Sequence, residues 1–297
     1  YDLYTNLKAH FETMAYIATT KKPMEANVSH HFAFRGADDI TYIVSNYLCA
    51  KLAKQMGIRH FVCQNMLNTP RFTWGIQDLA KARAMLLLIK PLEDKHFKVI
   101  HQPRAGLDYF KPDIDKAKIQ LAAVSALMDD IDPHNHHSPP IIHVVSYSEA
   151  LFLATPEVIH ESIQITQHAI ASYRRLRQKD AIRDMSHHPE IDRRVKEMLD
   201  QAKKLIHAIE NLIPDPYSPE GFYLIFASGF LPVPYLWQEV EEFKYAKNWN
   251  TQPHQGGMVI ADENDQVMDI EKRIDIAKHN IDQAKQTLSK KVLAHLK

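Results

Sequence analysis

Four groups of polar side chains recur along the first half of the chain, each directly after a short apolar segment. The groups are His30, His31 and Arg35; Gln64, Asn65 and Arg71; His101, Gln102 and Arg104; and Ser146, Tyr147 and Glu149. Cations and hydrogen-bond donors predominate in them, and Glu149 is the prominent acid. Guanidinium and imidazole groups bind anions, and a carboxylate binds hydroxyl groups. This composition favours an anionic, hydroxyl-bearing small molecule over a metal ion as the ligand.

These groups can act together only if the fold brings them together. In folds built from parallel strands, the carboxyl ends of the strands meet on one face, and the loops there carry binding and catalytic residues. The alternative interpretation is that the groups belong to ordinary solvated loops, which contain polar residues in any protein. The functional interpretation therefore depends on the fold.

The fourth group follows the clearest strand pattern in the sequence. Five apolar or aromatic residues lie within seven positions: Ile141, Ile142, Val144, Val145 and Tyr147. A run without alternation is typical of a parallel strand that is covered on both faces. Three more strands are predicted at 24–28, 59–63 and 97–101. Helices are predicted over 2–20, 38–55, 76–88, 113–128 and 156–177.

Successive strand–helix units imply parallel strands with right-handed crossovers. We predict a TIM (β/α)8-type barrel, of which residues 1–177 supply about four βα units. An open sheet of four or five strands fits the same pattern. Residues 178–297 are predicted to form a helical C-terminal extension with a small hairpin near 256–268 and a closing helix over 269–295. With 8 glycines and no Gly-rich loop, a dinucleotide fingerprint is absent.

The charge balance and the cysteines limit the classes of function. Lys+Arg and Asp+Glu both number 36, which argues against a nucleic acid or an anionic membrane as the main partner. No apolar run reaches the length of a membrane span, and no signal peptide is visible. Cys49 and Cys63 lack C-x-x-C spacing, which favours a reducing compartment, and we expect a cytoplasmic protein.

A histidine-rich loop is the one candidate metal site. His134, His136 and His137 lie close together, but Asp132 is the only nearby carboxylate and no thiolate is near. We therefore predict no metal site. Cys63, at a strand end, is interpreted as packing and not as a nucleophile.

Several short segments occur in an informative order. They are residues 75–80 (GIQDLA); His101-Gln102 followed by Gly106 and by Lys116-Ala117; Glu149-Ala150 followed by Thr155 and Glu157; and a tail with Gly221, residues 243–248 and Asp262. This order resembles the catalytic (epsilon) subunit of glutamate mutase over most of residues 1–280. More distantly, the chain resembles the large subunits of lysine and ornithine aminomutases, which also use pyridoxal phosphate.

The resemblance implies an isomerase, an adenosylcobalamin-dependent radical mutase that rearranges the carbon skeleton of a small acid. In that family a (β/α)8 barrel covers the corrinoid, which a separate Rossmann-like domain carries. It therefore implies two partners: a corrinoid-binding Rossmann-like subunit, and another chain or segment that supplies the remaining barrel half. The cofactor performs the radical chemistry, and the protein positions and shields it.

By its position, Glu149 matches the acid that contacts the adenosyl ribose, and Ser146 lies beside it. His101, Gln102 and the residues after them, including Leu107, match the segment that covers the corrin ring. The candidate catalytic residues are Glu149, His101 and Arg104. The candidate substrate-binding residues are His31, Arg35, Asn65 and Arg71.

The chain departs from the family at three points. Val145 replaces a lysine that contacts the ribose, and Arg104 stands where an apolar corrin-facing residue is expected. The corrinoid-binding signature D-x-H-x-x-G is absent, because Asp94 and His96 are followed by Val99. The first half of the family's barrel, which holds the substrate-clamping arginines, has no counterpart, so glutamate is unsupported as the substrate. Three alternatives stay open: a non-catalytic scaffold or regulatory relative, an aminomutase subunit, and an unrelated small-molecule α/β enzyme.

Overall fold

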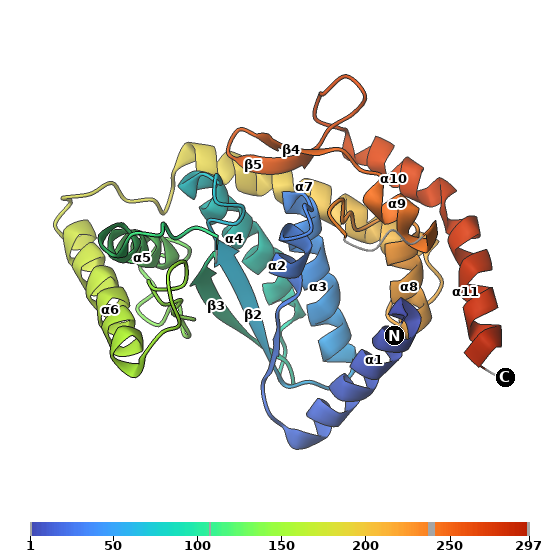
Figure 1. The fold of residues 1–297 in the computed structure, drawn as a ribbon, viewed down its shortest axis with the longest axis horizontal. Helices are drawn as coiled ribbons and strands as arrows, with labels where there is room; N and C mark the ends of the chain where they lie inside the picture. Colours follow the sequence, from blue (N-terminus) through green and yellow to red (C-terminus); the bar gives the residue numbers. More distant parts are fainter. Residues whose placement is uncertain (1, 107, 237–240, 296–297) are drawn as a thin grey trace.

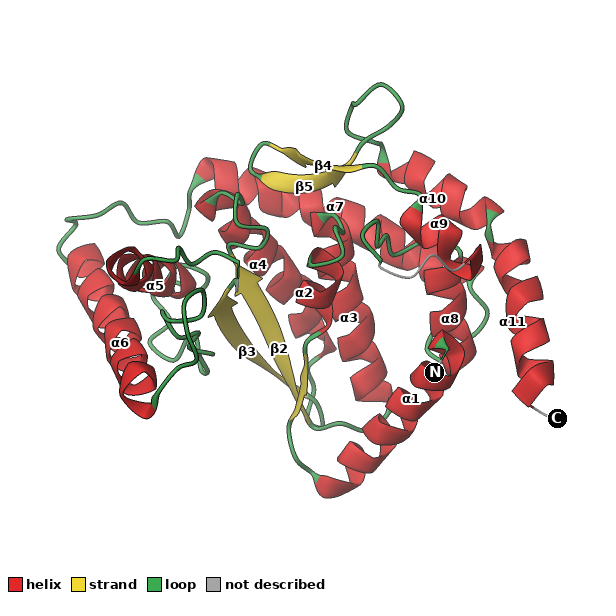
Figure 2. Cartoon of the chain, in the orientation of Figure 1, coloured by secondary structure: helices red, strands yellow, loops and turns green. Residues whose placement is uncertain are grey.

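The computed structural model of the chain describes residues 2–106, 108–236 and 241–295. It is a mixed α/β structure in which helices surround a small parallel sheet (Figure 2). The first part contains α1 (Leu3–Thr20), β1 (Met24–Ala26), α2 (Val28–Ala33), α3 (Asp39–Gln55), β2 (His60–Leu67), α4 (Gly75–Ile89), β3 (Lys98–Ala105), α5 (Ile114–Asp129) and α6 (Pro156–Gln178). The second part contains α7 (Pro189–Leu212), α8 (Pro219–Ala227), α9 (Lys244–Lys247), β4 (Thr251–His254), β5 (Gly257–Ile260), α10 (Ile270–His279) and α11 (Ile281–His295).

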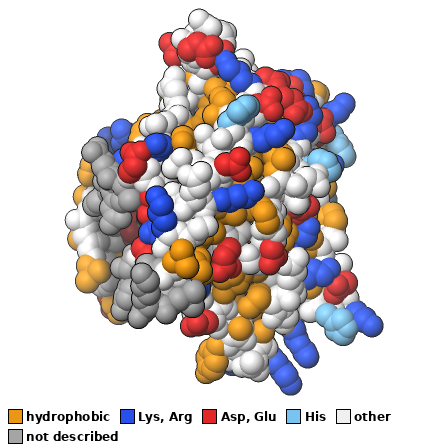
Figure 3. Space-filling model, turned by 90° about the vertical axis from the view of Figure 1, so that its right-hand side faces the viewer, with side chains coloured by type: hydrophobic (Ala, Val, Ile, Leu, Met, Phe, Trp, Pro, Cys, Tyr) orange, Lys and Arg blue, Asp and Glu red, His pale blue; other side chains and the backbone are white. Residues whose placement is uncertain are grey.

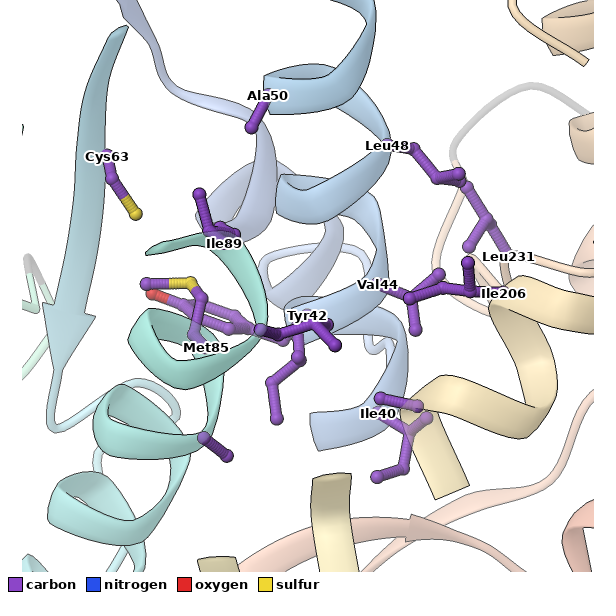
Figure 4. Packing of buried hydrophobic residues seen from close by; sticks show 14 of the residues in the cluster. Ile40, Tyr42, Val44, Leu48, Ala50, Cys63, Met85, Ile89, Ile206 and Leu231 are labelled. Atoms are coloured by element: carbon purple, nitrogen blue, oxygen red, sulfur yellow. The ribbon is translucent and has the colours of Figure 1, made fainter. Parts of the chain in front are cut away.

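The parallel sheet has the order β1-β2-β3. Because this order follows the sequence, right-handed crossovers place the connecting helices on one face of the sheet. On that face, α3 and α4 pack against β2 (Figure 1). Cys63 of β2 points toward these helices, where Tyr42, Met85 and Ile89 are also buried (Figure 4).

Five helices of the first part, α1, α3, α4, α5 and α6, confirm the sequence prediction to within one residue at each end, whereas α2 was not predicted. For α3, hydrogen bonds at the N-terminus explain why the helix begins where the sequence predicts. The Oδ1 atom of Asp38 accepts hydrogen bonds from the N–H groups of Ile40 and Thr41, both at 3.0 Å, which satisfies donors at the helix N-terminus. Gly57 follows the helix with φ +83°, a conformation that favours glycine.

The predicted fourth strand is wrong. The segment after α5 makes one parallel bridge, between Arg104 and His143, where the His143 N–H donates to the Pro103 carbonyl at 3.1 Å. Pro139 and Pro140 have no N–H group with which to extend a ladder. Across the described residues the parallel strands number three and do not close, so a (β/α)8 barrel is not confirmed.

The second part shares the core of the first part. Helix α7 packs on α3 and α4, and α8 packs between α1 and α11 (Figure 1). One hydrophobic cluster contains buried residues from Tyr4 to Leu288. The first helix of the predicted C-terminal extension begins only at Pro189, and the expected closing helix is divided at Asn280. The hairpin is displaced toward the N-terminus, because β4 pairs with β5 and only Ala261 and Val267 bridge across the polar turn.

The surface carries both signs of charge. On the side of the molecule nearest α11, acidic and basic side chains are interspersed (Figure 3). Among the helices of the described ranges, none has both the length and the apolar character that crossing a membrane would require.

A buried ion network fixes the hairpin to the first part. The Oδ1 atom of Asp39 accepts from Lys81 Nζ at 3.1 Å, and Oδ2 accepts from Gln77 Nε2 at 2.7 Å and from the Met258 N–H at 3.1 Å. Lys81 is 1% exposed, so its ammonium depends on the carboxylates of Asp39 and of Asp78, which lies 4.0 Å away. Gly257 approaches so closely that a Cβ there would lie 2.5 Å from Asp39 Oδ2.

We predict that Asp39→Asn lowers the free energy of unfolding by roughly 3 kcal/mol, because it removes the nearer of the two carboxylates that pair with the buried Lys81 ammonium and, among the described residues, leaves only Asp78, at 4.0 Å. The matched control is Lys204→Met, which breaks the exposed ion pair of Lys204 with Glu271 at 2.9 Å. That pair should contribute less than about 1 kcal/mol. Urea unfolding of both variants makes the comparison, and equal losses would contradict a structural role for the network.

Candidate functional site

The register of the sheet separates two sets of side chains. Cys63 pairs with His101 and Gln64 pairs with Gln102, and successive residues of a strand point to opposite faces. Since Cys63 faces the helices, His101 faces them too. Gln64, Gln102 and Arg104 therefore share the opposite face, which we call the polar face.

Glu25 lies on the polar face and is held there by two amides. Gln64 Nε2 donates to Glu25 Oε1 at 2.8 Å, and Gln102 Nε2 donates to Glu25 Oε2 at 3.2 Å. Gln64 Nε2 also donates to Gln102 Oε1 at 2.8 Å. The three side chains join all three strands of the sheet across this face.

Arg104 is the cation of the polar face, and it is almost uncompensated. Its side chain is 8% exposed, and it makes one hydrogen bond, from Nε to the Ala105 carbonyl at 3.4 Å. No ion pair among the described residues includes it. Burial lowers the pKa of Arg104, while the carboxylates of Glu149 and Glu25 act in the opposite direction. A buried guanidinium with free donors is a ready binding group for an anion.

Two histidines border Arg104 and are held neutral. His30 of α2 is 4% exposed, and burial, followed by His31, Arg104 and His143, lowers its pKa to about 4. His143 follows the same pattern, because burial and then Arg104 lower its pKa. At neutral pH both rings therefore offer hydrogen bonds and no charge.

Glu149 lies at the edge of this group with an accessible carboxylate. It is exposed, and its side chain makes no hydrogen bond to any of the described residues. It is close enough to Arg104 and His143 to affect their pKa values. Ser146 is half-buried and shares a hydrogen bond of 2.9 Å with the Ser148 hydroxyl, so the two serines bind each other.

Several predicted site residues lie elsewhere. His101 is 5% exposed on the helix face, and neither ring nitrogen has a partner among the described residues. Asn65 faces the helices as well, is 0% exposed, and accepts a hydrogen bond from the Tyr42 hydroxyl at 3.3 Å. Neither side chain can reach a ligand on the polar face. Leu107 falls outside the described residues.

The remaining candidates are at least partly exposed to solvent. Arg71 and His31 are exposed, and Arg35 is half-buried and donates from Nη1 to the His31 carbonyl at 2.8 Å. His31 stacks near His30, with ring centroids 4.8 Å apart, so it lies adjacent to the polar face.

Two residues of this site were missed by sequence reasoning, Glu25 and His143. Both lie inside segments that the sequence predicts to be strands, whereas the predicted site residues follow those segments or lie at their ends. The available signal was alternation: Glu25, Gln64 and Gln102 occupy positions on the same face of adjacent strands.

Metal and thiol chemistry find no support in the described ranges. No group of three or more His, Cys, Asp or Glu side chains there is arranged to hold a metal ion. His134 instead pairs with Asp184 at 2.7 Å. Burial raises the pKa of Cys63 to about 12, which leaves the thiol inert at neutral pH.

No protein-family model matches the chain, and no curated protein gives a significant match. The resemblance to cobalamin-dependent mutases therefore depends on the segments quoted above.

We predict that His101→Leu changes stability and leaves ligand binding unaffected. Burial lowers the pKa of His101 to about 3, so the unfolded chain takes up the proton first and the native state loses stability as pH falls below 6.5. Removing the ring should abolish a loss on the order of 3 kcal/mol between pH 6.5 and pH 4. Chemical unfolding at both pH values measures this, with the exposed His10→Leu as the control. An unchanged acid dependence would contradict the placement of His101.

Proposed function

We propose that the chain is a barrel-forming subunit or fragment of an adenosylcobalamin-dependent radical mutase that acts on a small acid, similar to glutamate mutase. One observation carries the proposal. At the carboxyl end of the parallel sheet, the buried cation Arg104 and the accessible acid Glu149 lie near each other without an ion pair between them. Leaving a buried charge uncompensated costs stability, which is typical of a site that a ligand completes.

The residues fit the adenosyl part of the cofactor better than the corrin part. Glu149 is free to accept hydrogen bonds from ribose hydroxyls. His101 does not fit a corrin contact, because it faces the helices, and Gln102 is engaged with Glu25 and Gln64. Val145, at the position of the family's ribose-contacting lysine, is 4% exposed and offers no polar contact. Adenosylcobalamin, when bound, supplies the radical chemistry.

The chain's own residues bind and orient the substrate. In this proposal Arg104 takes the carboxylate of the acid, because its donors are free and its surroundings strengthen the attraction. The neutral rings of His30 and His143 add hydrogen bonds without competing as cations. An anion next to them would raise their pKa values, so binding of the acid should be accompanied by proton uptake below neutral pH.

A subunit of a cobalamin- and pyridoxal-phosphate-dependent aminomutase is the second candidate, and Arg104 favours it. A guanidinium in place of the expected apolar residue suits a phosphate or a second carboxylate. The fully buried Lys81 offers no Schiff-base amine, since it bonds to Asp39 and to the Thr69 carbonyl at 3.2 Å. In this candidate the lysine would come from a partner.

An apolar groove supports a binding place for the remaining barrel half. The outer edge of residues 139–146 and one face of α6 form an apolar groove of about 480 Å³. Ile142 and Val144 line it from one side, and Ile159 and Ile163 from the other. In this proposal, a strand–helix unit of another chain or segment packs its apolar side chains into this groove. The corrinoid-binding subunit would approach the carboxyl ends of the strands.

Glu149→Gln should weaken the binding of adenosylcobalamin by roughly 10- to 100-fold, which corresponds to the loss of a charge-assisted hydrogen bond. The melting temperature should stay unchanged, because Glu149 bonds to no described side chain. The matched control is the exposed Glu12→Gln on α1, which should affect neither quantity. Severe unfolding of the Glu149 variant would indicate a structural role instead.

The proposal itself is tested by purifying the chain with its native partners and recording the visible absorption spectrum. A stable complex that contains corrinoid is expected. A chain that binds no added adenosylcobalamin, even with a candidate partner, would overturn the proposal and favour a non-catalytic scaffold.

A further inference from the structure

Glu25 is exposed, but the two glutamine side chains that hold it are buried. The residue is exposed at the edge of the sheet, whereas Gln64 is 1% exposed and Gln102 is 6% exposed. Each of these two buried amides donates a hydrogen bond to a different oxygen of the Glu25 carboxylate. An exposed glutamate ordinarily samples many rotamers, so this arrangement restricts a side chain that solvent would otherwise leave free.

The Gln64 amide is oriented so that its nitrogen, and not its oxygen, faces the Glu25 carboxylate. Gln64 Nε2 donates both of its hydrogens, and its own Oε1 is buried without a partner in the described part of the chain. Reversing the amide would satisfy that oxygen no better, because it would then face the Glu25 carboxylate. The Gln64 Oε1 atom therefore stays buried without a hydrogen-bond donor among the described residues, while the amide nitrogens of Gln64 and Gln102 fix the Glu25 carboxylate.

The fixed carboxylate has no cation of its own. No ion pair among the described residues includes Glu25 or Arg104, although Glu25 is close enough to affect the pKa of Arg104. His30 and His143 do not supply the missing charge, because both are neutral at neutral pH. The polar face thus presents one fixed anion and one fixed cation, held apart.

We propose that Glu25 is a specificity-determining residue of this site, which binds an ammonium group of the substrate whose carboxylate lies at Arg104, with Gln64 and Gln102 as its positioning residues. The proposal rests on the substrate site proposed above. It explains why the two charges are held and not paired: a ligand with both signs of charge completes each of them. The competing interpretation is a ladder that only joins the three strands.

The test uses pairs of small probes that differ only in an amino group. Linear ω-amino acids of three to six carbons are compared with the matching carboxylic acids by calorimetric titration of the full chain with its native partners. The wild type should bind the amino acid of at least one length about tenfold more tightly than the matching acid, which is the effect of one charge-assisted hydrogen bond. In Glu25→Gln the preference should vanish while the affinity for the plain acid persists. In Arg104→Met both affinities should fall.

A second variant separates positioning from folding. Gln64→Met keeps the side-chain volume and the Glu25 charge but removes the donor, so the preference should shrink while the affinity for the plain acid persists. If acids bind but the amino group makes no difference, or if Glu25→Gln lowers the melting temperature and leaves the preference intact, Glu25 is only a structural ladder residue. If no acid binds and Arg104→Met changes nothing, the anion site of the proposed function fails, and the inference fails with it.

Discussion

The site depends on the pairing register of β2 with β3. Because Cys63 lies opposite His101 and Gln64 opposite Gln102, every second side chain enters the helix-covered core, and Gln64, Gln102 and Arg104 lie on the opposite face. A shift of one residue would exchange the two sets, placing Arg104 and Gln102 among Tyr42 and the α4 side chains. The buried apolar residues of β2 make that shift costly, so the core of the protein also fixes the polarity of its candidate site.

The helical second part strengthens this arrangement from the opposite side. Helix α7 covers α3 and α4, and the charges of Asp39 and Lys81 join the start of α3 to α4 and to the hairpin. Asp38 does the same for α10, because it caps α3 and also pairs with Arg273 at 3.0 Å. Two adjacent carboxylates at one helix N-terminus thus hold the loops at the carboxyl ends of the strands in place. A rigid support of this kind is what a ligand-positioning face requires.

Local signals in the sequence predicted five of the six helices of the first part, because caps and apolar periodicity act over a few residues, but they missed the short α2. Asp38 and Gly57 mark the ends of α3 in the sequence and in the structure. The fourth strand was not predictable in the same way. Ile141 to Tyr147 have strand-forming side chains, but the segment makes one bridge to β3, at His143, and Pro139 and Pro140 cannot extend a ladder toward the N-terminus. The site was predicted only in part, since His101 and Gln102 are neighbours in sequence and lie on opposite faces. Register decides which of them is useful, and register is a property of the pairing and not of either segment alone.

The central claim is that the ligand lies on the polar face, between Glu25, Arg104 and Glu149. A density map of the chain bound to its native partners, adenosylcobalamin and substrate tests it most directly. The account predicts substrate density at Arg104 and the adenosyl group within hydrogen-bonding distance of Glu149. A polar face without bound density, with the ligands held instead in the pocket that Arg194 of α7 and Met258 of the hairpin line, would contradict it.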